Sequence, residues 1–419
     1  MDKVELSGFS TEEMCFLGCG TAGDDSVRHR VLGFTGRVGT DPSPGRFWTT
    51  IRRAIQYPGS SAVADSKMKF RAAFLTLLSV VTLPLASFAD TTVVITGGNA
   101  SKGVLFDRAE ALLSGFTKVN GTNSSIRSYK NGTIASQPGL GKVTIHFVLN
   151  GAALGLANLR DQAAVGTASG GSLVPQAAVS SVQPETVGID GSIYTTVQTA
   201  VVPFVYIKNP NLPNSIHGVT NLTQRQASYL ESASGALPTA FFGGESTNDP
   251  IYLVGRDTGS AVRLVLDANV YFSDTPSFWV TNKAPNPPLP PIRDIVTFGL
   301  PTGGDVTNNL TVIPNAIGTV SAGDVGGFTP LAFEGIPFSS ANVANGSYPL
   351  WGYESWYTLT GGTGVPSGPQ QTVINLLLGL IKDSSYQHTN SNFVGKFVPL
   401  GDLQVSRTVD GGPISSTIY

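Results

Sequence analysis

One glycine-rich turn contains the residues with the clearest chemistry. An apolar strand pattern at 252–254 leads into this turn, and an apolar pattern that can begin a helix follows at 264–266. A strand that enters a helix through such a turn directs backbone N–H groups and the positive end of the helix at one point, where an anion is stabilised. An arginine can add a bidentate pair of hydrogen bonds, and short polar side chains can add more. Turns of this kind also serve simply as connections, so both interpretations stay open. The turn consists of Arg256, Asp257, Thr258, Gly259 and Ser260.

Two further segments repeat the order of strand, small-residue turn and helix. A strand pattern at 92–96 is followed by a turn and by helical spacing at 104–113, and a strand pattern at 142–149 by a turn and a helical segment at 154–159. In open α/β sheets, ligands bind at the carboxyl ends of the strands, so the three turns are expected to face one ligand. The serine of the first turn can also serve only as a helix N-cap. The candidate ligand-binding residues are Gly98, Asn99, Ala100 and Ser101 in the first of these turns, and Asn150 and Gly151 in the second.

The remaining patterns predict further strands, helices and loops. The pair Asn131-Gly132 predicts a two-residue hairpin turn. The stretch 162–192, rich in Ala, Ser and Gly, predicts an exposed connection, and the proline-rich segment 283–291 is typical of a stiff surface loop. Strands are expected at 200–208, 270–272, 278–281, 310–313, 348–359 and 405–407, and helices at 222–230 and 370–382.

Residues 68–89 match a secretory signal peptide. A basic start at Met68–Arg71 precedes an apolar run, and Ser87 and Ala89 supply the small residues of a cleavage site. The simplest hypothesis is that translation begins at Met68 and that residues 1–67 come from a wrongly assigned start and are disordered. The rival hypothesis is a cytosolic extension ahead of an uncleaved anchor, although the apolar run is short for a membrane span. Export with cleavage near Ala89 predicts a periplasmic or extracellular protein.

Composition after Ala89 excludes several classes of function. Both cysteines lie before this point, so no disulfide framework is expected. The rest of the chain holds 16 Lys and Arg against 20 Asp and Glu without a basic patch, which argues against nucleic acid as a partner. Its histidines, His146, His217 and His388, are widely separated, and the chain has no HExxH, Gly-x-Ser-x-Gly or Walker motif. The sequence therefore predicts a noncatalytic protein without a metal or cofactor.

Five separated segments, taken in order, resemble those of one family: the phosphate-type (PstS-like) substrate-binding proteins of bacterial ABC transporters, which have the type II periplasmic-binding-protein fold. The order and rough spacing of the segments cover most of residues 90–360. The segments are Ile95–Gly98, Val201–Asn209, Leu222–Gln226, Val254–Ser260 and Tyr348–Tyr353.

The resemblance implies an α/β fold of two lobes joined by two crossing hinge strands, near 201–209 and 348–357. Lobe one would comprise 90–203 plus 350–419, and lobe two 204–349. Phosphate or another small oxyanion would lie in the cleft between the lobes, which would close around it by a hinge motion. The implied partner is an ABC permease, and a monomer is expected.

Two positions depart from the anion-binding pattern of that family. Val262 stands where a threonine is expected and Ala152 where a serine is expected, whereas Ala100 and Ser101 can fill the first turn. Each missing donor to a desolvated oxyanion costs about 1–3 kcal/mol. The alternative hypothesis is an extracellular or cell-surface fold relative that has lost anion binding and has a structural or interaction role.

Overall fold

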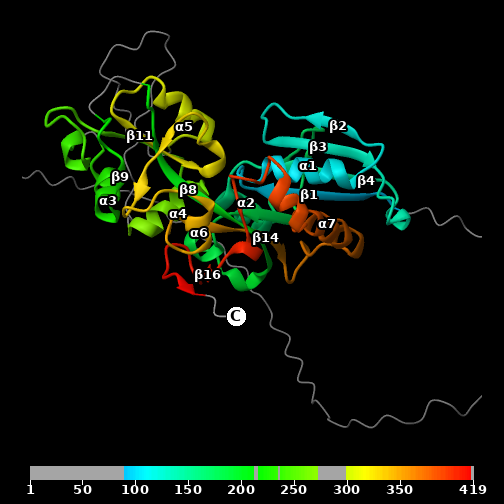
Figure 1. Ribbon diagram of the computed structural model, residues 1–419. Coiled ribbons are helices and arrows are strands. Elements are labelled where there is room, and N and C mark those ends of the chain that lie inside the picture. The colour runs from blue at the N-terminus through cyan, green and yellow to red at the C-terminus, as the bar shows by residue number, and fades with distance from the viewer. Residues whose placement is uncertain (1–88, 212–215, 235, 272–298, 417–419) are drawn as a thin grey trace, which may run out of the picture. The chain divides into compact units, whose positions relative to one another are not determined.

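The computed structural model describes four ranges of the chain, all within one compact unit, Val80–Tyr419 (Figure 1). These ranges are 89–211, 216–234, 236–271 and 299–416. Four predictions concern residues outside the described ranges. They are the mis-assigned start at 1–67, the signal peptide up to residue 88, the strand at 278–281 and the proline segment at 283–291.

A large mixed sheet runs through the described part of the chain. Its strands are β1 (Thr91–Gly97), β2 (Thr117–Asn120), β3 (Ile126–Gly132), β4 (Val143–Val148), β7 (Ala177–Ser180), β8 (Tyr194–Lys208), β10 (Tyr252–Val254), β11 (Ala316–Ser321), β12 (Thr329–Pro330), β14 (Trp351–Leu359) and β15 (Val398–Pro399). Their order is β10-β11-β8-β14-β7-β1-β4-β3-β2, and β12 and β15 also pair with β8. β1 is parallel to β4 and β7, and β10 is parallel to β11, whereas β8 and β14 are antiparallel to each other.

Helices cover this sheet. They are α1 (Lys102–Leu112), α2 (Ala152–Asp161), α3 (Gln224–Ser232), α4 (Ala261–Val270), α5 (Gly303–Leu310), α6 (Ser340–Ala344), α7 (Gly368–Ile381) and α8 (Ser384–Thr389). α1 lies in the connection from β1 to β4, and α2 lies in the connection from β4 to β7, which is on the other side of β1. The two connections run in opposite directions across the sheet, so right-handed crossovers place α1 and α2 on opposite faces of the sheet. α1 packs against α7, and α2 packs on β1 and β7. The predicted α/β class is confirmed.

Shorter elements complete the described chain. The small strands are β5 (Val165–Gly166), β6 (Ser172–Leu173), β9 (Asn221–Leu222), β13 (Ala332–Phe333), β16 (Val405–Ser406) and β17 (Ser415–Ser416). The 3₁₀ turns are η1 (Pro138–Leu140), η2 (Pro184–Val187), η3 (Gly191–Ile193), η4 (Thr239–Phe242), η5 (Ala322–Asp324) and η6 (Leu400–Asp402).

Two long strands, β8 and β14, join the two halves of the sheet. We call β7, β1, β4, β3 and β2 the first half and β10, β11 and β12 the second half. β8 pairs with β14 from Tyr194 to Pro203 and then with β11 from Phe204 to Lys208. Pro203, which has no N–H to donate, lies where the pairing with β14 ends. The predicted pair of crossing strands is therefore confirmed.

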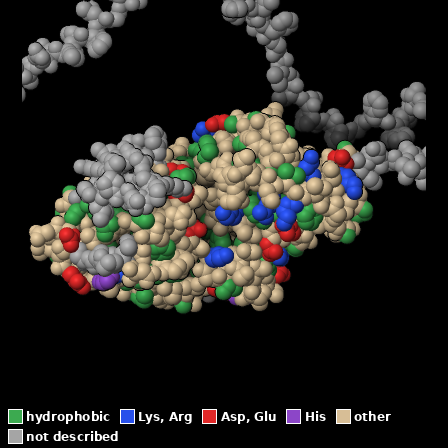
Figure 2. Space-filling model, turned by 90° about the horizontal axis from the view of Figure 1, so that it is seen from above, with side chains coloured by type: hydrophobic (Ala, Val, Ile, Leu, Met, Phe, Trp, Pro, Cys, Tyr) green, Lys and Arg blue, Asp and Glu red, His purple; other side chains and the backbone are tan. Residues whose placement is uncertain are grey.

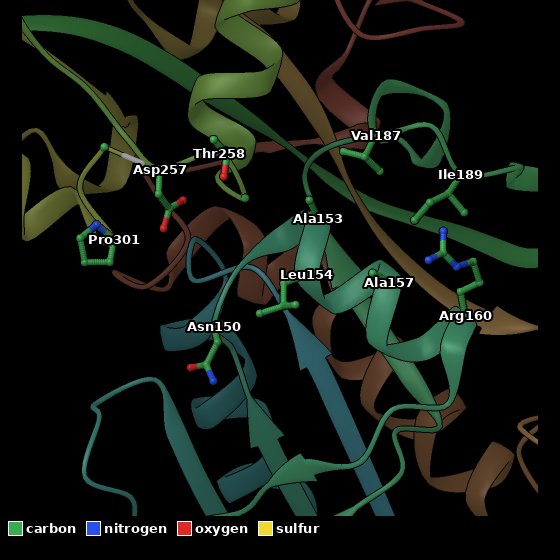
Figure 3. A pocket seen from close by; sticks show the side chains of 12 residues that line it. Asn150, Ala153, Leu154, Ala157, Arg160, Val187, Ile189, Asp257, Thr258 and Pro301 are labelled. Carbon is green, nitrogen blue, oxygen red and sulfur yellow. The ribbon is translucent and has the colours of Figure 1, made fainter. Parts of the chain in front are cut away.

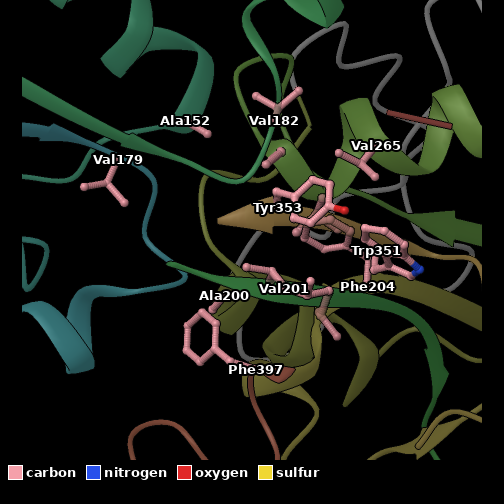
Figure 4. Packing of buried hydrophobic residues seen from close by; sticks show 14 of the residues in the cluster. Ala152, Val179, Val182, Ala200, Val201, Phe204, Val265, Trp351, Tyr353 and Phe397 are labelled. Atoms are coloured by element: carbon pink, nitrogen blue, oxygen red, sulfur yellow. The ribbon is translucent and has the colours of Figure 1, made fainter. Parts of the chain in front are cut away.

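Aromatic side chains fill the core where these crossing strands meet α4. Trp351, Phe204 and Val265 pack together at this point (Figure 4), and all three are fully buried. Removing a large apolar side chain from water contributes about 1.5–3 kcal/mol, so this cluster holds the two crossing strands and α4 to one another.

Several local predictions were wrong. The stretch 162–192 is not only an exposed connection, because it contains β7, a fully buried strand that pairs with both β1 and β14. Asn131-Gly132 is not a hairpin turn: both residues belong to β3, Asn131 has a positive φ of 58°, and the register of β3 against β4 shifts between Tyr129 and Gly132. Leu310 ends α5 and Val270 ends α4, so neither lies in a strand.

A C-terminal segment, Leu403–Asp410, ties the two halves of the sheet together from the side of β14. The Asp410 carboxylate accepts hydrogen bonds from the Gln183 backbone N–H at 2.7 Å and from the Thr186 hydroxyl at 2.8 Å. The Arg407 guanidinium lies over the Trp351 ring and donates to the Pro349 carbonyl and the Asn269 side chain. We call this segment the C-terminal strap.

Candidate functional site

A pocket of about 690 Å³ opens between the turn after β4 and the turn after β10. α2 forms one wall, and the loop after η2 and the segment 299–301 complete the lining (Figure 3). The Asp257 side chain points into the space between Leu154 and Pro301. The lining residues are Asn150, Ala153, Leu154, Ala157, Arg160, Val187, Ile189, Asp257, Thr258, Gly259, Gly299 and Pro301.

The two turns contact each other directly. The backbone N–H of Ala153, in the first turn of α2, donates to the Gly259 carbonyl at 3.3 Å. Gly151 has a φ of 148°, which favours glycine, and a Cβ there would lie 3.5 Å from the same carbonyl. One N–H at the amino end of α2 is therefore already satisfied by the other turn.

Arg256 is buried behind the pocket rather than in its lining. It is only 7% exposed, and it donates from Nε to the Leu300 carbonyl at 3.1 Å and from Nη2 to the Pro301 carbonyl at 2.9 Å. The backbone continues this pairing, because the Asp257 N–H also donates to the Leu300 carbonyl. Burial lowers the pKa of Arg256, and the nearby Asp257 and Asp324 carboxylates oppose that change. Arg256 thus fixes the segment at 299–301 that forms the wall of the pocket.

Asp257 places a carboxylate at the amino end of α4. Burial raises its pKa, while Arg256 and the backbone N–H groups of Gly259 and Ser260 act to lower it. These N–H groups are among those that would bind an external anion at a helix N-terminus. Ser260 is the N-cap of α4, but its buried side chain makes no capping hydrogen bond. The chain's own carboxylate therefore meets the positive end of this helix.

The first predicted turn lies apart from this pocket lining. Ser101 is 4% exposed and, with Glu354, lines a separate small cavity. Gly98 approaches the start of α2, because a Cβ there would lie 3.4 Å from the Ala152 Cβ. The structure brings Asn150, Asp257, Thr258 and Gly259 together around the pocket, with Gly151 beside them. It does not bring Gly98, Asn99, Ala100, Ser101, Arg256 or Ser260 into that lining. The ligand-binding role of all these residues stays a prediction.

Sequence reasoning missed the apolar wall of the pocket. Ala153, Leu154 and Ala157 lie on one face of α2, and Leu154 is 48% exposed. An exposed leucine next to two alanines at helical spacing is a weak signal, since single exposed apolar residues are normal. Val187 and Ile189 were hidden because the stretch 162–192 has the composition of a loop.

Charge around the pocket is sparse and mixed. Arg160 donates two hydrogen bonds to its neighbour Asp161, at 2.7 and 2.8 Å. Figure 2 shows a face on which Lys and Arg side chains are interspersed with Asp and Glu.

In the described ranges, no three His, Cys, Asp or Glu side chains form a group that could hold a metal ion. No described helix combines the length and apolarity needed to cross a bilayer.

Comparisons with solved structures find phosphate-transport proteins and a regulatory domain. The chain is similar to a phosphate ABC transporter substrate-binding protein with bound phosphate from Clostridium perfringens, with 16% identity, 74% of this chain and 100% of that chain covered, and a TM-score of 0.48. It is similar to an ABC-type phosphate transport receptor from Vibrio cholerae, with 15% identity, 73% and 99% covered, and a TM-score of 0.46. The regulatory domain of CcmR from Synechocystis is also similar, with 13% identity, 70% and 99% covered, and a TM-score of 0.39.

No protein-family model and no curated protein sequence matches the chain. All three TM-scores are below 0.5, and one fold can serve unrelated functions. The ligand therefore has to be inferred from the chain's own side chains.

Proposed function

We propose that this chain is an exported, noncatalytic solute-binding protein, and that it holds a small organic amine in the pocket between the turn after β4 and the turn after β10. The observation that supports this proposal is the meeting of these two turns around a pocket of about 690 Å³ with a carboxylate in its lining. Small-molecule sites in proteins typically have volumes of about 300–1,000 Å³, a mostly apolar lining and a few polar groups. Export rests on the signal-peptide pattern at 68–89.

The chemistry of the lining favours an amine over an inorganic oxyanion. Asp257 offers a partly desolvated carboxylate, and an opposite charge beside such a group stabilises its ionised form. Asn150 and Thr258 can orient the solute by hydrogen bonds, while Leu154 and Ile189 can contact an apolar body. Arg160 is already bonded to Asp161 and leaves the wall of α2 largely apolar.

Phosphate or another small oxyanion, passed to an ABC permease, is the second candidate. The amino end of α4, preceded by a glycine turn with Arg256 and Ser260 nearby, favours it, because such an end attracts anions. An oxyanion would first have to displace Asp257 from this end and free Arg256 from two backbone carbonyls. The amine needs neither rearrangement.

A thermal-shift series tests both candidates. Millimolar amino acids and small amines are compared with phosphate and sulfate, and hits are titrated by calorimetry. We expect an amine to raise the melting temperature and its Kd to rise at least about tenfold in Asp257→Asn, since a charge-assisted contact is worth about 1.5–3 kcal/mol. Asp402→Asn is the matched control, because Asp402 is exposed and lies outside the lining.

Stabilisation by phosphate or sulfate and by no amine would replace the first candidate with the second. No response to any solute would favour the alternative, a fold relative that has lost its ligand.

A further inference from the structure

A buried carboxyl group, that of Glu354, lies in the first half of the sheet with little compensation. Glu354 is 3% exposed, and neither carboxyl oxygen has a hydrogen-bond partner of standard geometry among the described residues. The Ser101 hydroxyl is also buried without such a partner. Ser101 and Ser181 nevertheless lie close enough to the carboxyl group to act on its pKa. Two serine hydroxyls thus face one carboxyl group in a nearly closed space.

The surroundings of Glu354 are unfavourable for a charge. The small cavity that it shares with Ser101 has a volume of about 10 Å³ and is otherwise lined mainly by apolar side chains, including Trp356 and Phe393. No Lys, Arg or His among the described residues forms a salt bridge with Glu354. Burial raises the pKa of Glu354 to about 7, and the two serines act in the opposite direction. An isolated carboxylate in such surroundings is costly, so packing alone gives no reason for its presence.

The position of Glu354 is that of a ligand in an open α/β sheet. β1 and β7 are parallel neighbours, and Ser101 and Ser181 follow their carboxyl ends. β14 runs antiparallel to β7 with Ser355 opposite Ser180, so Glu354 reaches the same edge of the sheet. Ligands bind at this edge, and serine hydroxyls there are suitable donors to an oxyanion.

We propose that Glu354 is a specificity-determining residue: its carboxyl group occupies the place of a small oxyanion between Ser101 and Ser181 and excludes inorganic oxyanions from the site. This cavity is separate from the pocket of the proposed function, and the proposal goes beyond that function. Above about pH 7 the carboxylate also repels an incoming anion, in addition to filling the space.

The backbone at Glu354 does not require an acid. The strand register shifts between Glu354 and Ser355, and Thr199 donates from its hydroxyl to the Glu354 carbonyl at 3.0 Å. Both features involve the backbone of Glu354, so an alanine or glutamine can keep them. Substitution therefore tests the carboxyl group itself.

The experiment measures anion binding to Glu354→Ala and Glu354→Gln at pH 8. Glu354→Ala removes a carboxyl group and so opens room for a small anion, and we expect millimolar formate or phosphate to raise its melting temperature by about 2 °C or more. Calorimetry should give a saturable isotherm that the wild-type protein lacks. Glu354→Gln keeps the volume and is expected to bind neither anion, while confirming that the fold survives loss of the charge. The matched control is Glu231→Ala, which removes another fully buried carboxyl, on α3.

Two results would overturn the proposal. One is equal stabilisation of the wild-type protein and of Glu354→Ala by formate, which would show that Glu354 excludes nothing from this cavity. The other is a folded Glu354→Ala protein that neither formate nor phosphate stabilises. Failure of the proposed function is distinguishable from both, because it concerns amines in the wild-type protein and the Asp257→Asn variant.

Discussion

The polar groups in the turns of the two halves of the sheet face different kinds of acceptor. In the first half, the hydroxyls of Ser101 and Ser181 face a side chain, the carboxyl group of Glu354. In the second half, Arg256 donates to backbone carbonyls, those of Leu300 and Pro301. A side-chain acceptor can be removed by one substitution, whereas a backbone acceptor cannot. We therefore expect a single substitution to change the response of the first half to anions, and not that of the second half.

The largest expected effect is a loss of stability when the hydrogen bonds of Arg256 in the second half are removed. Arg256→Ala leaves the Leu300 and Pro301 carbonyls without their donor and empties a buried volume, so we expect the free energy of unfolding to fall by about 4 kcal/mol. Chemical denaturation measures the change. Arg160→Ala is the control, because its exposed ion pair with Asp161 contributes little. Equal behaviour of the two variants would contradict a stabilising role of the hydrogen bonds from Arg256 to Leu300 and Pro301.

The next largest expected effect is a pH dependence of the free energy of unfolding, which comes from Glu354 in the first half. The pKa of Glu354 is raised from 4.5 to about 7 in the folded protein, so the folded state holds this proton more tightly than the unfolded state. Its stabilising contribution is complete below about pH 4.5 and is lost as pH rises through 7, a change of about 3 kcal/mol.

Denaturation of the wild-type protein and Glu354→Gln at pH 5 and pH 8 measures this contribution as the change in the difference between them. Burial also raises the pKa of Asp267 and Glu231, but these groups are present in both proteins and their effect cancels. A difference that does not change with pH would mean that Glu354 is solvated and not enclosed by Ser101 and Ser181.

The smallest expected effect comes from substituting the two glycines, Gly151 and Gly259, where the turns contact each other. Gly151 has a φ of 148°, so Gly151→Ala is expected to cost about 2 kcal/mol in backbone strain. Gly259 has no positive φ, and a Cβ there would meet only Asp257 Oδ1 at 4.0 Å, so Gly259→Ala should be tolerated. Melting temperatures of the two variants measure the contrast. A similar loss in both would show that the contact between the turns, and not the strain at Gly151, limits stability.

Much of the fold could be predicted from the sequence because its buried strands are continuous apolar runs. β1, β4 and β8 read in this way, as strands covered on both faces do. Thr223 and Gln226 form the capping box that starts α3. β7 could not be predicted, since its four small residues become a strand only through pairing with β1 and β14.

The candidate site could be predicted only where chemistry lies in short stretches of sequence. Asn150 and Asp257 follow strand patterns, so their turns were found and the structure places both in one pocket lining. The hydrogen-bond partner of Arg256 at Leu300, by contrast, lies 44 residues further along the chain, and no local sequence pattern predicts this contact. Glu354 was not singled out because a glutamate in an aromatic strand has no motif. Only the packing of α1 residues around it, together with Ser101 and Ser181, reveals its setting.

The C-terminal strap has a consequence for how a solute enters. Asp410 is bonded beside η2, next to the wall at Val187, while Arg407 is bonded to Asn269 on α4, whose opposite end meets the pocket. The C-terminal strap thus contacts both walls of the pocket. Wide separation of these walls would break buried polar contacts of either Asp410 or Arg407. We therefore expect the exchange of a bound solute to require rotation of exposed side chains at the pocket mouth, such as Leu154, and not wide separation of the two walls.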